Sequence, residues 1–210
     1  MKVILVNGSP NAHGSTYTAL NEVASTLNQE DIQTQIFQVG TQPLSGCLAC
    51  FKCSAIGRCV LSDRVNEFLE LADGADGFIF GAPVHFSAIS GSMSSFMHRV
   101  FFAALVHGSD TFYLKPAAAV VATRRAGATS ALDQLNKYFT IAEMMTIGSK
   151  YWNMVFGMVA DDVKHDLEGL QTMRVLGRNM AWFLRCKAAA EKAGVALPKR
   201  EKRISTNFIR

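Results

Sequence analysis

Four cysteines form the stretch of the chain that is richest in possible chemistry. Cys47, Cys50, Cys53 and Cys59 lie within thirteen residues, with the spacing Cys-x2-Cys-x2-Cys-x5-Cys. Four thiolates are the number that one [4Fe–4S] cluster needs, and the first three cysteines have the spacing of ferredoxin ligands. Zinc is also bound by four thiolates, although usually by two separated Cys-x2-Cys pairs. The spacing therefore leaves open an iron–sulfur cluster, a zinc site, or reduced or redox-active thiols without metal.

A second candidate site is the loop from Gly8 to Thr16, which follows the first apolar run of the chain. The loop lacks the lysine of a Walker motif and the close Gly-x-Gly of a dinucleotide fingerprint. Its hydroxyl residues Ser9, Ser15 and Thr16 lie where the chain enters a helix, and a helix N-terminus favours an anion. The loop thus predicts a site for a terminal phosphate monoester, the alternative being an ordinary turn with Ser15 as the helix cap.

Two later loops offer surfaces for a planar ring. Gly81–Ser87 follows an apolar run and presents Pro83 to Phe86, where a flat ring could lie, although a lone histidine in such a loop is more often a hydrogen-bonded surface residue. Thr123–Gly127 contains Arg124 and Arg125. These arginines are either solvated or placed beside a ring that gains negative charge on reduction, whose potential they would raise.

Alternating strand and helix patterns position these loops, as in βαβ units. Ligands of open parallel sheets bind outside the carboxyl ends of the strands, near the point where strand order reverses. The pattern predicts a three-layer, doubly wound, parallel five-stranded α/β sheet, with the loops after its first, third and fourth strands at one edge. The expected strands are Lys2–Asn7, Gln33–Val39, Ala75–Gly81, Lys115–Thr123 and Met145–Gly148, and the expected helices are Thr16–Leu27, a helix capped by Asp63, Gly91–Val106, Ser130–Glu143 and Leu167–Ala193.

Two features of these helices carry further expectations. The stretch Gly91–Val106 is apolar on nearly every face, which predicts burial within its own domain and against a partner subunit. The fifth cysteine, Cys186, lies beside Trp182 and Phe183 on the last helix, and we expect it to be an inert core residue.

Composition indicates one domain, residues 1–195, followed by a solvated basic tail, residues 196–210. The chain has 210 residues, 49% of them apolar, and a net charge of +4 that comes largely from the tail. The tail lacks interleaved aromatic residues except Phe208, so neither nucleic acid nor membrane is an expected partner. No export or membrane-spanning segment is readable, which predicts a cytoplasmic protein with reduced thiols. Only 18% of residues are charged, against about 25% in typical domains, which favours a homodimer or homotetramer.

Several motifs follow one another along nearly the whole chain, and their order and spacing together are fairly specific. They are Gly8-Ser9-Pro10 with Gly14-x-Thr16, Gly81-Ala-Pro83-Val-His-Phe with Ser90-Gly91, Tyr151-Trp-Asn-Met-Val155, Glu168-Gly169-Leu170, and Asn179-Met-Ala-Trp182. Together these motifs resemble the NAD(P)H-dependent FMN reductase and iron–sulfur flavoprotein group of the flavodoxin-like superfamily.

The resemblance implies a flavodoxin-like fold that binds FMN. The phosphate would lie on Ser9, Asn11, Ser15 and Thr16, and the isoalloxazine on Pro83, Val84, His85, Phe86 and Ser87. The pyrimidine edge would meet Thr123, Arg124, Arg125 and Gly127. The cysteines resemble the compact motif of iron–sulfur flavoproteins, which pass single electrons between a cluster and FMN, but similar loops occur in flavin reductases of the group that have no cluster. The chain departs from many relatives at Asn11, Ser15 and His85, where Arg, Asn and Tyr are common.

These features predict an FMN-dependent oxidoreductase. NAD(P)H or another donor would reduce the flavin, and electrons would pass to a quinone, a free flavin, another small-molecule or protein acceptor, or the cluster. No side chain need be a proton catalyst, because the flavin performs the hydride chemistry. The alternatives are an electron carrier that serves a protein partner and has no substrate of its own, and a phosphate-binding regulatory module without redox activity.

Overall fold

The computed structural model describes residues 1–201, 204, 206 and 208. The strands within these residues are β1 (Lys2–Asn7), β2 (Gln33–Gln38), β3 (Gly77–His85), β4 (Ala88–Ile89), β5 (Pro116–Thr123), β6 (Met145–Thr146) and β7 (Met154–Phe156). The helices are α1 (Ser15–Gln29), α2 (Cys53–Ile56), α3 (Arg64–Ala72), α4 (Gly91–His107), α5 (Ala128–Ile141), α6 (Ala160–His165) and α7 (Leu167–Lys192).

The sheet has five positions in the order β2-β1-β3-β5-β6, and its neighbouring strands are parallel. The predicted doubly wound α/β fold is therefore confirmed. The last position is shared by two short strands, because β6 pairs with the start of β5 and β7 pairs with its end. The sequence predicted β6 as a single last strand and missed β7. It also missed β4, which pairs antiparallel with the end of β3.

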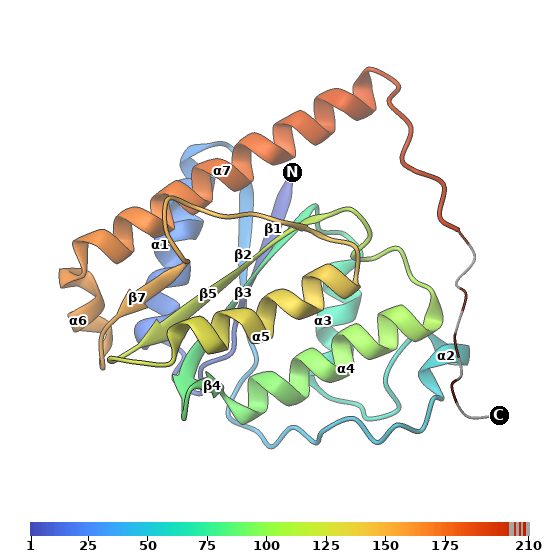
Figure 1. Ribbon diagram of the computed structural model, residues 1–210, viewed down its shortest axis with the longest axis horizontal. Helices are drawn as coiled ribbons and strands as arrows, with labels where there is room; N and C mark the ends of the chain where they lie inside the picture. The colour runs from blue at the N-terminus through green and yellow to red at the C-terminus, as the bar shows by residue number, and fades with distance from the viewer. Residues whose placement is uncertain (202–203, 205, 207, 209–210) are drawn as a thin grey trace.

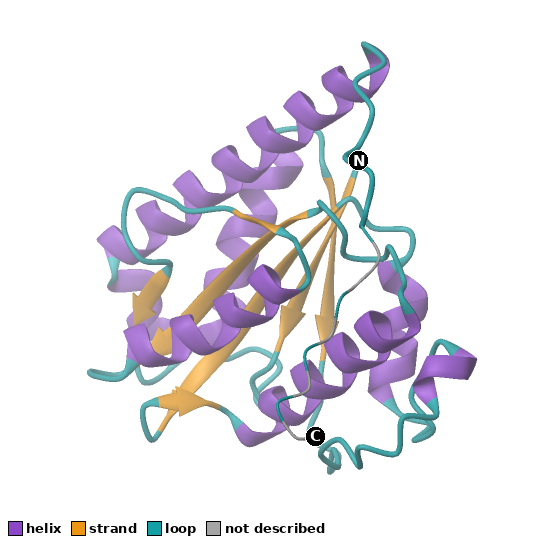
Figure 2. Cartoon of the chain, turned by 45° about the vertical axis from the view of Figure 1, so that its right-hand side comes forward, coloured by secondary structure: helices purple, strands orange, loops and turns teal. Residues whose placement is uncertain are grey.

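Helices cover both faces of the sheet and make three layers (Figures 1 and 2). Alternate residues of β1 show the two faces, since Val3 and Leu5 belong to the core beneath α1 and α7, whereas Ile4 and Val6 belong to the core beneath α3, α4 and α5. Side chains of a strand point alternately to opposite faces, so a strand that is covered on both sides is apolar throughout. This explains the continuous apolar runs in the sequence.

Helix α4 is apolar on most sides because its own chain surrounds it. Phe101 stacks on Phe112 at 4.7 Å and packs against Phe80 of the sheet at 5.7 Å and Tyr138 of α5 at 5.4 Å. On another side, Phe102 packs against Phe51 at 5.4 Å. These contacts account for much of the apolar surface that suggested a partner subunit.

Two local expectations are wrong. The cap of α1 is Gly14, not Ser15, which is the first residue of the helix. Cys186 is exposed, because it lies on the outer side of α7, away from the buried positions Ala181 and Leu184. The expected cap of α3 is confirmed, since the Asp63 side chain accepts a hydrogen bond from the Val65 N–H at 3.1 Å.

Residues 196–199 of the basic tail are exposed, and Arg200 contacts the domain while staying partly exposed. The Arg200 guanidinium pairs with Asp110 at 2.6 Å and Glu143 at 3.0 Å, and lies 4.1 Å from the ring centroid of Tyr113. Residues 202–203, 205, 207 and 209–210 of the predicted tail lie outside the described residues.

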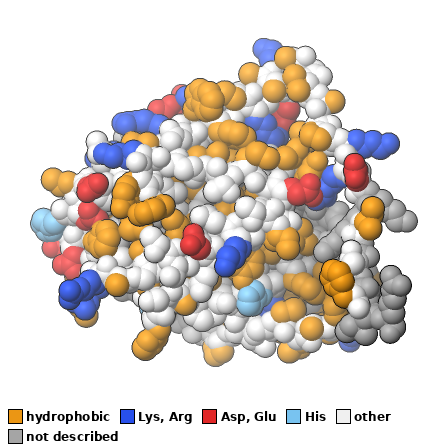
Figure 3. Space-filling model, in the orientation of Figure 1, with side chains coloured by type: hydrophobic (Ala, Val, Ile, Leu, Met, Phe, Trp, Pro, Cys, Tyr) orange, Lys and Arg blue, Asp and Glu red, His pale blue; other side chains and the backbone are white. Residues whose placement is uncertain are grey.

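Apolar side chains remain on the surface of the molecule. Many are visible on the face drawn in Figure 3, among scattered charged groups. Tyr151, Trp152 and Met158 are each more than half exposed. In the described part of the chain, no helix combines the length and the apolar character that crossing a membrane requires.

Candidate functional site

The carboxyl ends of β1, β3, β5 and β7 surround a cavity of about 570 Å³. This volume lies within the usual range for small-molecule sites, roughly 300–1,000 Å³. Nine of the predicted site residues line the cavity, namely Ser9, Asn11, Ser15, Thr16, Pro83, Val84, His85, Thr123 and Arg124. The topology thus brings the three predicted loops together at one edge of the sheet.

The first loop, residues 8–16, is held from below by a polar network. The Asn7 side chain donates to Gln38 Oε1 at 2.6 Å, and Gln38 Nε2 donates to the Ser9 carbonyl at 2.6 Å. The Ser9 N–H donates to Asn7 Oδ1 at 3.1 Å, and Ser9 Oγ accepts the Asn11 N–H at 3.1 Å. These bonds preorganise the loop at the start of α1, where helix N–H groups lack intrahelical partners.

Thr16 is the residue of this loop whose side chain is buried without a hydrogen-bond partner in the described part of the chain. Its side chain is 1% exposed, and its Oγ1 is the one buried side-chain oxygen or nitrogen without a hydrogen-bond partner among the described residues. A buried hydroxyl without a partner is costly, so its presence calls for an explanation, of which a bound ligand is one. Ser15 differs, because its Oγ donates to the Gly157 carbonyl at 3.4 Å.

The second loop, residues 81–87, and the third loop, residues 123–127, meet at the rim of the cavity. Phe86 and Ser87 form the turn between β3 and β4 with φ of 50° and 61°, and this turn carries Phe86 fully into solvent. Gly127 has φ of 87°, and a Cβ on it would lie 2.7 Å from the Ser87 Cα. Close approach of the two loops therefore requires glycine at this position. Phe86, Ser87, Arg125 and Gly127 do not line the cavity.

A fourth wall, residues 157–161, was missed by the sequence analysis. Gly157 N–H donates to the Thr123 carbonyl at 2.9 Å, which ties the wall to β5. The Asp162 carboxylate accepts the N–H groups of Met158 at 2.8 Å and Val159 at 3.1 Å. The pair Asp161-Asp162 after Gly157 was the available signal, because acidic residues are favoured in the first turn of a helix.

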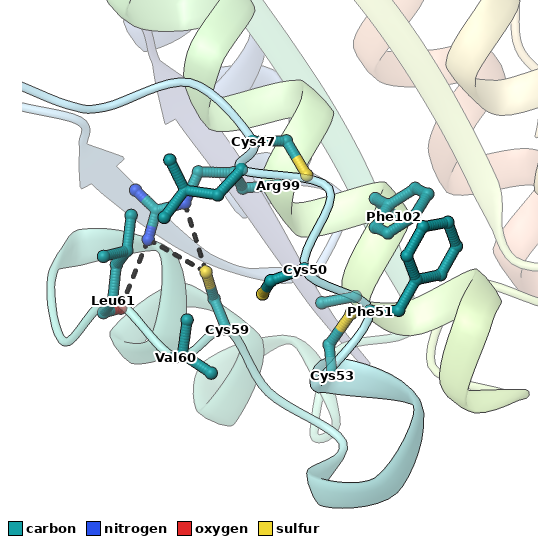
Figure 4. A pocket seen from close by; sticks show the side chains of 11 residues that line it. Cys47, Cys50, Phe51, Cys53, Cys59, Val60, Leu61, Arg99 and Phe102 are labelled. Carbon is teal, nitrogen blue, oxygen red and sulfur yellow. Dashed lines mark hydrogen bonds between the residues drawn. The ribbon is translucent and has the colours of Figure 1, made fainter.

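The second candidate site is the cysteine segment, residues 45–63, which lies against α4 (Figure 4). All four cysteines line one pocket together with Arg99 and Phe102. Cys47 and Cys50 are exposed, Cys53 is buried at the start of α2, and Cys59 is half-buried. Burial raises the pKa of the Cys53 thiol, and the other three thiols add to this rise.

The thiols face one pocket but are not gathered into a metal geometry. No three His, Cys, Asp or Glu side chains of the described residues are arranged to hold a metal ion. Cys47 and Cys50 lie on a stretch without helix or strand, Cys53 is the first residue of the short helix α2, and Cys59 follows that helix. The donor set has the number and the chemistry that a [4Fe–4S] cluster requires, and its binding would need the four sulfurs to draw together.

The two sites lie at different positions along α4. Ser90, just before α4, donates to the Gly8 carbonyl of the first loop at 2.9 Å, whereas Arg99 lines the cysteine pocket. With a rise of about 1.5 Å per residue, these positions are roughly 14 Å apart along the helix. The sites are therefore separate but belong to the same helical layer.

Comparison with known proteins identifies the family. Residues 1–158 match the family described as NADPH-dependent FMN reductase. The chain belongs to this family. An iron–sulfur flavoprotein of Methanocaldococcus jannaschii is 32% identical over 190 residues, which cover 86% of this chain and 96% of the relative. A second iron–sulfur flavoprotein of that organism is 28% identical over 188 residues, which cover 83% of this chain and 92% of the relative.

The solved structures agree on the fold. An archaeal flavodoxin superposes with a TM-score of 0.60 at 13% identity, covering 88% of this chain and 99% of the flavodoxin. The fold is therefore flavodoxin-like, as the sequence resemblance implied. Membership of the FMN reductase family makes the chain a flavin-dependent oxidoreductase.

The cavity fits FMN by its own chemistry. The buried Thr16 hydroxyl lacks a partner in the described structure, and it lies at the N-terminus of a 15-residue helix. A phosphate dianion supplies hydrogen-bond acceptors, and its charge suits the positive end of the helix dipole. The apolar Pro83 and Val84 line the same cavity, where they can contact a planar ring.

Proposed function

We propose that the protein binds FMN in the cavity at the carboxyl edge of the sheet and transfers electrons from NAD(P)H, or another donor, to a small-molecule or protein acceptor such as a quinone or a flavin. The observation that carries the proposal is that Thr16, whose buried hydroxyl has no partner among the described residues, lines a cavity of about 570 Å³. The family match supports the flavin, and the family description supports a nicotinamide nucleotide as donor.

Each loop has a separate task in this proposal. Ser9, Asn11, Ser15 and Thr16 hold the phosphate, and Pro83, Val84 and His85 contact the ring. Thr123 and Arg124 lie at the pyrimidine edge, where the guanidinium stabilises negative charge. Bound FMN supplies the hydride and electron-transfer chemistry. The chain itself binds and orients the flavin, so no side chain is assigned a proton-transfer role.

Four residues that the family resemblance assigns to the flavin lie at the rim of the cavity. Phe86, Ser87, Arg125 and Gly127 lie outside the cavity lining, so they would contact the flavin only at its outer edge or shape the opening. The fully exposed Phe86 is well placed to meet an acceptor or a partner subunit. Together with the exposed Tyr151, Trp152 and Met158, it supports the proposal of a homodimer or homotetramer.

We also assign the four cysteines to a [4Fe–4S] cluster. Three observations support this proposal: the number of thiols, the single pocket that all four line, and the two relatives named iron–sulfur flavoprotein. Cys47, Cys50, Cys53 and Cys59 would be the ligands. Zinc and metal-free thiols are the competing outcomes of the test.

Anaerobic purification of the protein without a tag tests both assignments. We expect flavin absorption bands, about one FMN per chain, and about four irons per chain with a broad shoulder beneath the flavin bands. Saturable NADH or NADPH oxidation with a quinone supports an enzyme, whereas negligible turnover indicates an electron carrier. Protein that stays colourless after incubation with FMN would overturn the flavin assignment, and iron-free protein after reconstitution with iron and sulfide would overturn the cluster.

A further inference from the structure

Arg99 is buried in the middle of α4, beside the cysteine segment. Its side chain is 1% exposed and is the largest of the fully buried side chains among the described residues. Burying a guanidinium is costly unless its charge is paired and its N–H groups are bonded. The contacts that Arg99 makes therefore indicate why it is placed there.

The guanidinium bonds to both ends of the cysteine segment. Nη1 donates to Asp63 Oδ2 at 2.6 Å and Nη2 to Asp63 Oδ1 at 3.0 Å, a paired contact that balances the charge. Nη1 also donates to the Ser45 carbonyl at 3.4 Å, and Nη2, whose two hydrogens are shared among three acceptors, donates to the Leu61 carbonyl at 3.2 Å. Since Ser45 precedes Cys47 and Leu61 follows Cys59, one side chain closes the segment into a loop on α4.

Two further bonds reach a cysteine sulfur directly. Arg99 Nε donates to Cys59 Sγ at 3.3 Å and Nη2 donates to it at 3.2 Å, as the dashed lines in Figure 4 show. An ion pair that only joined α3 to α4 would need Asp63 alone. Asn66, not Arg99, binds the backbone of Cys59. The Asn66 side chain accepts the Cys59 N–H at 2.9 Å and donates to the Cys59 carbonyl at 2.9 Å.

We propose that Arg99 is the positioning residue of the cysteine segment, and that its two N–H···S hydrogen bonds to Cys59 favour the reduced form of the bound cluster. The first half concerns the chain alone, and the second rests on the proposed cluster. Reduction adds one negative charge to a cluster, and hydrogen bonds to its sulfurs stabilise that charge and raise the potential. Because Asp63 balances the guanidinium charge, the rise in the reduction potential comes mostly from the two hydrogen bonds to Cys59 and not from the net charge of Arg99.

Proteolysis of iron-free protein tests the positioning role. The segment contains two exposed trypsin sites, Lys52 and Arg58, whose cleavage requires the segment to open locally. We expect Arg99→Gln and Arg99→Lys to raise cleavage at these sites at least about tenfold, because one lysine nitrogen cannot span the same partners. The matched control is Arg185→Gln on α7, whose guanidinium pairs with Glu30 at the surface, and it should leave cleavage unchanged. Unchanged cleavage in folded Arg99→Lys would overturn the positioning role.

A redox titration of iron-loaded protein tests the effect on the cluster. We expect Arg99→Gln to lower the equilibrium constant for reduction roughly tenfold, which is about 59 mV for one electron, and Arg99→Lys to lower it less. Asn66→Ala separates this effect from loosening, because it releases the Cys59 backbone but leaves both bonds to the sulfur.

The two experiments together separate the two roles of Arg99. Asn66→Ala should raise tryptic cleavage but leave the reduction potential unchanged. An equal shift of the reduction potential in Asn66→Ala and Arg99→Lys would show that Arg99 has only a structural role. If wild-type protein takes up no iron, both the proposed cluster and the effect of Arg99 on its potential are wrong. The proteolysis result still decides the positioning role. If Arg99→Gln fails to fold, Arg99→Lys and Asn66→Ala still give both measurements.

Discussion

Replacing Thr16 by valine should change the free protein and the FMN complex in opposite directions. Valine has nearly the same shape as threonine but lacks the hydroxyl. In the described structure the Thr16 Oγ1 is buried without a partner, so the flavin-free protein carries the cost of an unsatisfied polar atom. In the proposed complex the same hydroxyl donates a hydrogen bond to the phosphate.

The size of each effect follows from the two states of the hydroxyl. An unsatisfied buried polar group costs about 1–3 kcal/mol, so Thr16→Val should stabilise the flavin-free protein by about 1 kcal/mol or more. For a chain of this length, each kcal/mol raises Tm by roughly 2–4 °C. A hydrogen bond to a charged group contributes about 1.5–3 kcal/mol, so the variant should bind FMN roughly ten- to a hundredfold more weakly.

Flavin fluorescence titration and thermal unfolding of flavin-free protein measure the two effects. Riboflavin lacks the phosphate, so it should bind wild type more weakly than FMN does and should bind Thr16→Val with unchanged affinity. The matched control is Thr26→Val in the same helix. Thr26 is also buried, but its Oγ1 donates to the Glu22 carbonyl at 3.0 Å. Its replacement should not raise Tm and should leave FMN affinity unchanged.

Two results would refute this reasoning. Equal affinity of the wild-type protein for FMN and riboflavin would show that the first loop is not a phosphate site. A fall in the stability of flavin-free Thr16→Val would show that the hydroxyl already has a partner in solution.

Three further predictions address the cysteines, the fourth wall and the assembly. Cys47→Ala should abolish iron binding while FMN stays bound, because the flavin contacts lie on other loops, and Cys186→Ala should leave both intact; iron retained by Cys47→Ala, measured by metal analysis, would contradict a four-thiolate cluster. Asp162→Ala should weaken FMN binding severalfold and lower stability by about 1–3 kcal/mol, because it frees two N–H groups of the wall, whereas the exposed Lys164→Ala should change neither quantity in titration and melting experiments. Light scattering at micromolar concentration should report a homodimer or homotetramer, and a monomer would contradict the proposed assembly.

The sequence predicted the fold because its signals are local. A strand such as β5 is buried on both faces, so it is apolar throughout, and the helical spacing of Leu20, Val23 and Leu27 marks the buried side of α1. Parallel strands place all their carboxyl ends at one edge, so the three loops could be assigned to one site before their contacts were known. The spacing of the four cysteines left a cluster, a zinc site and metal-free thiols open, and the structure added that all four line one pocket.

Which side chains face that site was decided by tertiary packing. Phe86 follows Pro83 and Val84 closely in sequence, but the left-handed turn at residues 86–87 sends it into solvent. Such a turn depends on the approach of Gly127, about 40 residues away, which no local pattern records. The pair Asp161-Asp162 was a local signal for the helix behind the wall at 157–161, but the contact of this wall with the first loop was not predictable, since Ser15 and Gly157 are 142 residues apart.

Arg99 is a residue whose role only the tertiary structure shows. In the sequence it is one charged residue within an apolar helix, and nothing near it indicates a partner. Its role follows from contacts with Cys59 and Asp63, which are 40 and 36 residues away and reach it only when the segment folds over α4. The sequence by itself thus determined the long strands β1, β2, β3 and β5 and the loops that follow them, because burial and spacing are local properties. The tertiary structure alone decided which groups meet, because hydrogen bonds and ion pairs depend on how distant elements pack.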